Sequence, residues 1–169
     1  MTTIARKIRI ETSSQLLDAI SFLSSVQRDI LDLFNQFGKS SSQKQLLARK
    51  ICTALMIAMQ VEEEGFYPVV KKAIKENGNI SAAIMKHSIM KYLISEIESL
   101  DEDSTIFDIK VSVLGEHVKE HFMAEQLKLF PKIVASQKVD LWTIGSNLAS
   151  RKTELESSSN LSFSAFCAR

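Results

Sequence analysis

The sequence is poor in residues that interrupt helices, with five glycines and two prolines among 169 residues. Apolar residues recur at three- and four-residue spacing through nearly all of the chain, which is the periodicity of helices that bury one face. Little of the chain is left for strands or long loops. The sequence therefore predicts an all-α fold.

Other scarcities exclude classes of function. The chain has 21 Lys and Arg against 20 Asp and Glu, so its net charge of +1 offers no general attraction for nucleic acid or an anionic membrane. No segment approaches the roughly 18 consecutive apolar residues of a membrane span, and the N-terminus has no apolar signal segment. Cys52 and Cys167 lack the spacing of a redox or metal motif. We expect a cytoplasmic protein without a structural disulfide, a nucleic-acid partner or a membrane partner.

Apolar stripes and turn residues divide the chain into four long helices and a short fifth one. They are expected at about residues 14–37, 43–74, 81–100, 105–136 and 139–154. We predict an antiparallel up-down-up-down four-helix bundle followed by the short C-terminal helix. The bundle domain should cover residues 1–156, and the Ser-rich tail over residues 157–169 should fray.

A short internal repeat links the second and fourth helices. Aligning Pro68 with Pro131 places Glu62 over Glu125 in a shared Glu-x4-aromatic-Pro pattern. Each proline should kink its helix, because proline has no backbone N–H. The repeat predicts two helical hairpins related by a pseudo-two-fold axis, with both prolines at the same end of the bundle.

The three histidines all lie in the second predicted hairpin. His117, His121 and Glu125 follow one another at four-residue spacing, so they form one stripe on a helix and can converge on a cation. His87 and Glu62, on two other helices, can approach the same layer. Imidazoles and carboxylates from facing helices hold iron, manganese or zinc in bundles. The alternative is that the histidines face solvent or only form hydrogen bonds.

Other polar and sulfur-containing residues are expected to play ordinary roles. Glu63 and Glu64 are interpreted as solvent-facing charges, whereas Glu62 and Glu125 would need hydrogen-bond partners or raised pKa values if they were buried without a cation. Four methionines within the helices should fill the core. They are Met56, Met59, Met85 and Met90.

A family pattern is carried by segments in all the predicted helices. They are Asp18-Ala19-Ile20, Val61-Glu62-Glu63-Glu64, Phe66-Tyr67-Pro68, Met85-Lys86-His87, Val113-Leu114-Gly115-Glu116, His121, Glu125, Leu129-Phe130-Pro131, Ile144-Gly145 and Arg151-Lys152. With these segments the chain resembles the hemerythrin-like HHE cation-binding family over about residues 16–155. The resemblance implies a helical bundle with a non-haem iron site.

The resemblance also assigns metal ligands. Family members bind two irons with a His on the first helix, a His-x3-Glu on the second, a His on the third and a His-x3-Glu on the fourth. The residues of this chain that match are Glu62, His87, His121 and Glu125.

Two ligand positions of the family differ in this chain. Gln27 stands where the first helix has its His, and Ala58 stands where the second helix has its His. An amide oxygen is a poor substitute for an imidazole, and alanine has no donor atom. The resemblance therefore implies one iron ion or partial occupancy rather than a full di-iron centre, with Gln27 and His117 as candidate additional ligands.

Three functions follow from these observations. The resemblance implies a protein that senses or handles iron, oxygen or nitric oxide, with a small diatomic molecule as its ligand. The alternative is a metal-free interaction or structural bundle, which can act as a homodimer. An enzyme is the third reading. The histidines and the partial ligand set permit redox chemistry, but the sequence has no recognisable nucleophile, phosphate loop or substrate-pocket motif.

Overall fold

The computed structural model describes residues 17–75, 77–100 and 104–167, with side chains up to residue 159. Every regular element in this range is a helix, which confirms the all-α prediction. The elements are α1 (Ala19–Lys39), α2 (Lys44–Val61), η1 (Glu62–Phe66), α3 (Tyr67–Ile74), α4 (Gly78–Glu98), α5 (Phe107–Ala124), η2 (Glu125–Leu129), α6 (Phe130–Ser136) and α7 (Leu141–Cys167).

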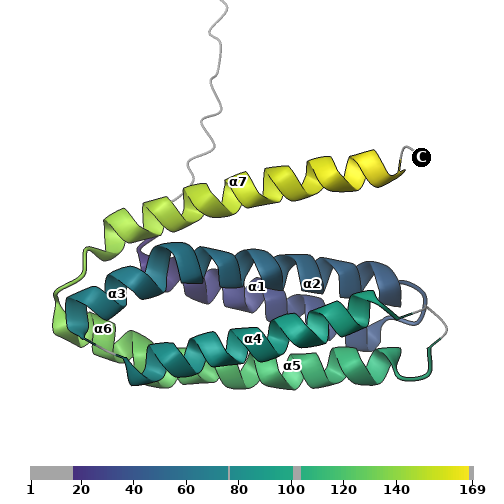
Figure 1. Ribbon diagram of the computed structural model, residues 1–169, viewed down its shortest axis with the longest axis horizontal. Helices are drawn as coiled ribbons and strands as arrows, with labels where there is room; N and C mark the ends of the chain where they lie inside the picture. Colours follow the sequence, from purple (N-terminus) through teal and green to yellow (C-terminus); the bar gives the residue numbers. More distant parts are fainter. Residues whose placement is uncertain (1–16, 76, 101–103, 168–169) are drawn as a thin grey trace, which may run out of the picture.

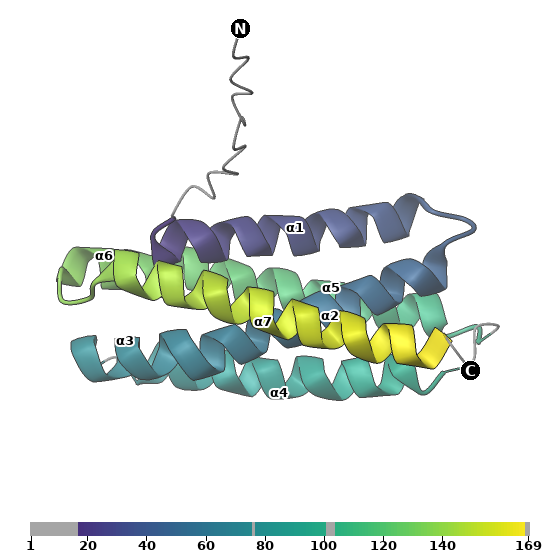
Figure 2. The ribbon, with the colours of Figure 1, turned by 90° about the horizontal axis from the view of Figure 1, so that it is seen from above.

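Two helical hairpins form the bundle. The first consists of α1 and the continuous rod α2–η1–α3, and the second consists of α4 and the rod α5–η2–α6 (Figure 1). Figures 1 and 2 both place α3 and α6 at the same end. At this end the ring centroids of Phe66 and Phe130 lie 6.0 Å apart, nearly perpendicular to each other. Pro68 and Pro131 therefore share one end of the bundle, as the internal repeat predicted.

Each proline follows a single turn of π-helix. The Tyr67 N–H donates to the Glu62 carbonyl, and the Phe130 N–H donates to the Glu125 carbonyl, so both bonds span five residues. Proline then stands in the first turn of the next α-helix, where its missing N–H costs little. π-turns are frequent at functional sites. Both wide turns begin at the glutamates that the sequence singled out.

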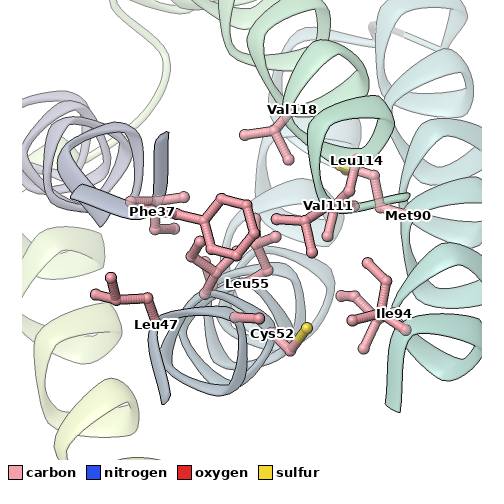
Figure 3. Packing of buried hydrophobic residues seen from close by; sticks show 14 of the residues in the cluster. Phe37, Leu47, Cys52, Leu55, Met90, Ile94, Val111, Leu114 and Val118 are labelled. Atoms are coloured by element: carbon pink, nitrogen blue, oxygen red, sulfur yellow. The ribbon is translucent and has the colours of Figure 1, made fainter. Parts of the chain in front are cut away.

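The apolar core consists of two clusters, one on either side of a polar layer. The first joins α1, α2, α4 and α5 and includes Phe37, Leu55 and Leu114 (Figure 3). The second joins α7 to the α3 and α6 end. Cys52 lies buried in the first cluster as a free thiol. Burial and the charge of Glu98 raise its pKa to about 12, so it stays protonated.

The fifth helix is longer than predicted. It was expected to end near residue 154, but α7 has 27 residues and continues to Cys167. Within α7 the serine hydroxyls donate to carbonyls four residues earlier, as Ser157 does to Thr153 at 2.9 Å, so they find partners inside the helix. The Ser-rich composition suggested a tail, yet residue 156 is not a break in the helix. Residues 168–169 lie outside the described part of the chain.

The helix α7 covers the first hairpin, where it packs on α1, α2 and η1 (Figures 1 and 2). Two glycines permit this close approach. A Cβ on Gly145 would lie 2.2 Å from the Leu17 carbonyl oxygen, and one on Gly65 would lie 2.8 Å from Leu148. No described helix is long and apolar enough to cross a membrane.

Candidate metal centre

One polar layer crosses the bundle between the two apolar clusters. Among the described residues, all the buried polar or charged side chains belong to it, and each is at most 3% exposed. They come from α1, the start of η1, α4, α5 and the start of η2. These residues are Gln27, Glu62, His87, His121 and Glu125. The structure thus brings together the four predicted ligands and Gln27.

Three of these residues can hold one cation. Glu62, His87 and His121 each offer a ligand atom, and these atoms all lie within 4.8 Å of one another. The Nε2 atom of His87 lies 3.1 Å from Nε2 of His121 and 3.2 Å from a Glu62 carboxylate oxygen. Two imidazoles and a carboxylate suit a first-row transition metal. This donor set fits a single metal ion.

The orientation of His87 favours metal binding. Its Nδ1 atom lies 2.8 Å from a carboxylate oxygen of Glu63, and the Lys91 ammonium donates to both oxygens of Glu63 at 2.8 and 2.9 Å. Burial would raise the pKa of Glu63, but its hydrogen bonds to Lys91 and His87 lower it. An ionised Glu63 can only accept, so Nδ1 of His87 carries a proton and Nε2 is the nitrogen that can present a lone pair to a cation.

Glu63 is therefore not the solvent-facing charge that the sequence suggested. Its contact with His87 depends on the π-turn of η1 and on Lys91 from α4, and neither is visible in the spacing of the acidic run. The reading of Glu64 was correct. Its carboxylate lies on the surface, where it accepts a hydrogen bond from Arg151 at 2.8 Å.

Glu125 is held by two neutral donors. The Tyr67 hydroxyl donates to one carboxyl oxygen at 2.6 Å, and the Gln27 amide donates to the other at 2.8 Å. That second oxygen lies 3.6 Å from Nε2 of His121, so Glu125 borders the cation site. Burial and the charges of Glu62 and Glu125 raise the pKa of Tyr67 well above 10, which keeps its hydroxyl a donor.

The two buried glutamates differ in charge. Burial would raise the pKa of Glu62, but hydrogen-bonding and charge interactions with His121 and His87 lower it below the usual range. Burial together with the charge of Glu62 raises the pKa of Glu125 to about 8. Two neighbouring carboxylates in a low-dielectric layer cannot both ionise easily. Glu62 is therefore the anionic carboxylate of the layer, and Glu125 holds a proton at neutral pH without a cation.

Tyr67 is a site residue that the sequence analysis missed. Besides its bond to Glu125, its hydroxyl lies 3.3 Å from a Glu62 oxygen and 3.4 Å from Nε2 of His87. The internal repeat contained the signal, because Tyr67 aligns with Phe130 and only Tyr67 has a hydroxyl. The hydroxyl thus links Glu125 to Glu62 and His87.

Gln27 offers a donor rather than a lone pair. The Gln126 amide donates to the Gln27 carbonyl oxygen at 2.7 Å, which leaves the Gln27 NH2 group for Glu125. Ala58 lies in the apolar cluster, 7% exposed, and has no donor atom. The side chains in this half thus fit the hydrogen bonds that they make and do not fit a second metal.

His117 lies apart from this donor set. It is half-buried on α5, one turn before His121, and it belongs to no group of described residues whose ligand atoms converge. Its positive charge, when present, acts on Glu120.

A surface groove leads toward the layer. It has a volume of about 450 Å³ and lies between α4 and the α5–η2 rod. His121 and Glu125 contribute to its lining, together with Lys86, Met123 and Leu127. Both site residues are at most 2% exposed, so they lie at its floor. The groove therefore brings solvent close to the layer, with its floor closed by these side chains.

Comparison with known proteins agrees with this geometry. Residues 18–133 match the hemerythrin HHE cation-binding domain. The chain belongs to this family. A solved hemerythrin HHE cation-binding domain-containing protein from Mycobacterium kansasii has the same fold, with a TM-score of 0.73 and 18% identity over 84% of this chain and 89% of that one. No curated protein sequence matches the chain.

Proposed function

We propose that this HHE domain binds one iron ion per chain through Glu62, His87 and His121, with Glu125 beside the ion. The observation that carries the proposal is the orientation of His87, whose Nδ1 atom faces Glu63 and whose Nε2 atom faces the other donors. A carboxylate behind a histidine fixes the tautomer that a metal requires. Two imidazoles and one carboxylate are also the donor set of many non-haem iron(II) sites.

The chain's own residues suggest what such a site handles. When bound, iron would supply a Lewis-acidic and redox-active centre for a small molecule such as oxygen or nitric oxide. The groove reaches close to the layer, and the Tyr67 hydroxyl lies 3.4 Å from the His87 nitrogen. The proposal includes sensing or handling of iron, oxygen or nitric oxide, and a cytoplasmic location.

The second candidate is a metal-free structural or interaction bundle. It is favoured by the completeness of the hydrogen bonding, because every buried side-chain nitrogen or oxygen among the described residues has a partner. A polar layer satisfied in this way can remain in the core without a cation. The two candidates differ in whether the layer has measurable affinity for metal.

Anaerobic titration of the metal-free full chain with iron(II), zinc(II) and manganese(II) tests the proposal. Calorimetry and elemental analysis should show about one ion per chain. A ligand that binds only the folded state at 100 times its Kd stabilises it by about 2.7 kcal/mol, so the Tm should rise. Nitric oxide added to the iron-loaded protein should change its absorption spectrum.

A matched pair of variants locates the ion. His87→Gln should abolish this binding, whereas His117→Gln should bind as the parent does, because His117 lies outside the donor set. If the parent binds no metal, the metal-free function is the correct one. If His87→Gln binds metal as well as the parent does, the ion lies elsewhere and the proposed site is wrong.

A further inference from the structure

The two hairpins differ in what covers their outer faces. α7 lies on the first hairpin, while the outer face of α4, α5 and η2, here named the α4–α5 face, has no described element on it (Figure 1). The most exposed large apolar side chains among the described residues are, with one exception, on this second hairpin. They are Leu127, Met85, Tyr92, Ile109 and Met123, and the exception is Trp142.

The exposed apolar residues form stripes along this face. On α4 they are Met85, Ile89 and Tyr92, spaced by four and then three residues, and on α5 they begin with Ile109 and Val113. This spacing keeps side chains on one side of a helix and is the pattern of helices that pair with other helices. Met85, 69% exposed, was expected in the core; Met56 is exposed as well, and only Met59 and Met90 are buried.

Two ion pairs join the helices of the α4–α5 face. Lys86 on α4 bonds to Glu120 on α5 at 2.5 Å, and Glu96 on α4 bonds to Lys110 on α5 at 2.5 Å. At the height of the first pair, α4 carries the positive charge and α5 the negative one. At the height of the second pair the signs are reversed. A copy of the same face can therefore meet this one with lysines opposite glutamates, which favours association of identical surfaces.

We propose that the α4–α5 face is covered by a second copy of this chain, in a two-fold dimer with α4 of each copy over α5 of the other. The two-fold axis is parallel to the helices, so each residue faces residues of the other copy at the same height along the bundle. Lys86 then lies opposite Glu120 of the partner subunit, and Glu96 lies opposite Lys110 of the partner subunit. Such an interface is self-complementary, as a two-fold dimer requires.

The shape of the face fits the same arrangement. The groove of about 450 Å³ is hollowed into the face beside Met123 and Leu127, and Met85 stands on α4 next to it without contributing to its lining. At the same level, the Met85 side chain of each copy faces the groove of the other. A flexible thioether is well suited to fill such an irregular gap.

The area of the face lies near the lower limit for a stable dimer. A helix of about 20 residues is about 30 Å long, and two helices side by side are about 20 Å wide, so each copy offers about 600 Å². Stable interfaces bury about 1,200–2,000 Å² in total, which is roughly 600–1,000 Å² per partner. This inference does not depend on metal binding, because the metal ligands lie beneath the face.

Sedimentation of the full chain over a wide concentration series tests the dimer. The parent should reach twice the 19.0 kDa mass of one chain. The double variant Met85→Glu with Ile109→Glu should weaken association by about 100-fold, because it removes two apolar contacts and adds charges opposite Glu120 and Glu96 of the partner subunit. The same positions changed to Lys should weaken it much less.

A control carries the same charge change elsewhere. Val134→Glu with Trp142→Glu alters two exposed apolar residues on α6 and α7, and it should dimerise as the parent does. All these sites are exposed, and circular dichroism should show unchanged helix content. A parent that stays monomeric overturns the proposal. So does a control that dissociates as far as the glutamate variant, or a lysine variant that is equally weakened.

Discussion

The two hairpins share one backbone design and differ in the chemistry that it carries. In each hairpin, one side chain of the first helix forms a hydrogen bond with a residue of the other hairpin. That residue directly follows the buried glutamate of its own hairpin. In one case Glu63 holds His87, and in the other Gln126 holds Gln27. The first pairing aims an imidazole lone pair at the centre of the layer. The second aims an amide donor at Glu125.

The same comparison extends along the second rod of each hairpin. His121 aligns with Ala58, and Phe130 aligns with Tyr67. One half of the layer therefore has imidazoles, whereas the other half has the Gln27 amide, the Tyr67 hydroxyl and the small side chain of Ala58. A symmetric scaffold can lose one metal position and keep its fold, because the lost donors are replaced by side chains that satisfy the remaining carboxylate.

The largest expected effect comes from making the first hairpin like the second. The double variant Gln27→His with Ala58→His should raise metal content from about one ion per chain toward two, as measured by elemental analysis. Histidine is only about 0.7 kcal/mol or less worse than alanine as a helix former. Packing is the larger cost, because Ala58 lies in the apolar cluster, and an added imidazole there costs roughly 1–3 kcal/mol.

The pseudo-symmetry sharpens this test. Glu63 accepts a hydrogen bond from His87, and Gln126→Glu would place a carboxylate in the same way beside the new imidazole at position 27. Adding this substitution should therefore raise the affinity for the second ion. A folded triple variant that still binds only one ion would show that the two halves are not equivalent.

The fold was predictable because it depends on repeated signals. Helical periodicity identified the bundle, and the Glu-x4-aromatic-Pro repeat placed Pro68 and Pro131 at one end. Two features were not predictable from such signals. The π-turns are defined by backbone hydrogen bonds that span five residues, and no residue pattern marks them. The serines of α7 suggested a tail, yet they lie in the helix with their hydroxyls bonded to its carbonyls.

The candidate site was only partly predictable. Spacing and family resemblance identified the buried glutamates and histidines, because ligands recur at fixed helical positions. Glu63 and Tyr67 were missed, since their roles arise from contacts between helices far apart in sequence. Spacing also could not separate His117 from His121, because residues one turn apart share a stripe whether or not both reach the core.

A smaller effect is expected from the residue behind His87. Glu63→Gln keeps the size of the side chain but removes the charge that Lys91 and His87 share. Loss of such an outer partner lowers metal affinity by roughly 10- to 100-fold. Titration calorimetry measures the change, and Glu64→Gln is the matched control because Glu64 faces the surface. Equal affinities in the two variants would remove the proposed role of Glu63.

The pKa of Glu125 predicts how the metal-free protein responds to pH. In the folded state this pKa is raised from 4.5 to about 8, so the fold holds a proton that the unfolded chain has lost. The resulting stability is complete below about pH 4.5 and is lost as pH rises to about 8. The free energy of unfolding should fall by on the order of 2 kcal/mol between pH 6 and 9. Urea denaturation measures it, and a Glu125→Gln variant should show a smaller decline.

The smallest effect is expected at Gln27, and it decides whether the two hairpins really differ in chemistry. Gln27→Leu removes the donor to Glu125 and the acceptor for Gln126, while Tyr67 still donates to Glu125 at 2.6 Å. Stability should fall by about 1 kcal/mol, the usual contribution of a hydrogen bond. Metal affinity should change by less than about tenfold, the lower limit for an outer partner, because the Gln27 oxygen already accepts from Gln126. Titration beside His87→Gln gives the comparison. A loss as large as that of His87→Gln would make Gln27 a metal ligand, and the first hairpin would then be a working half of the site.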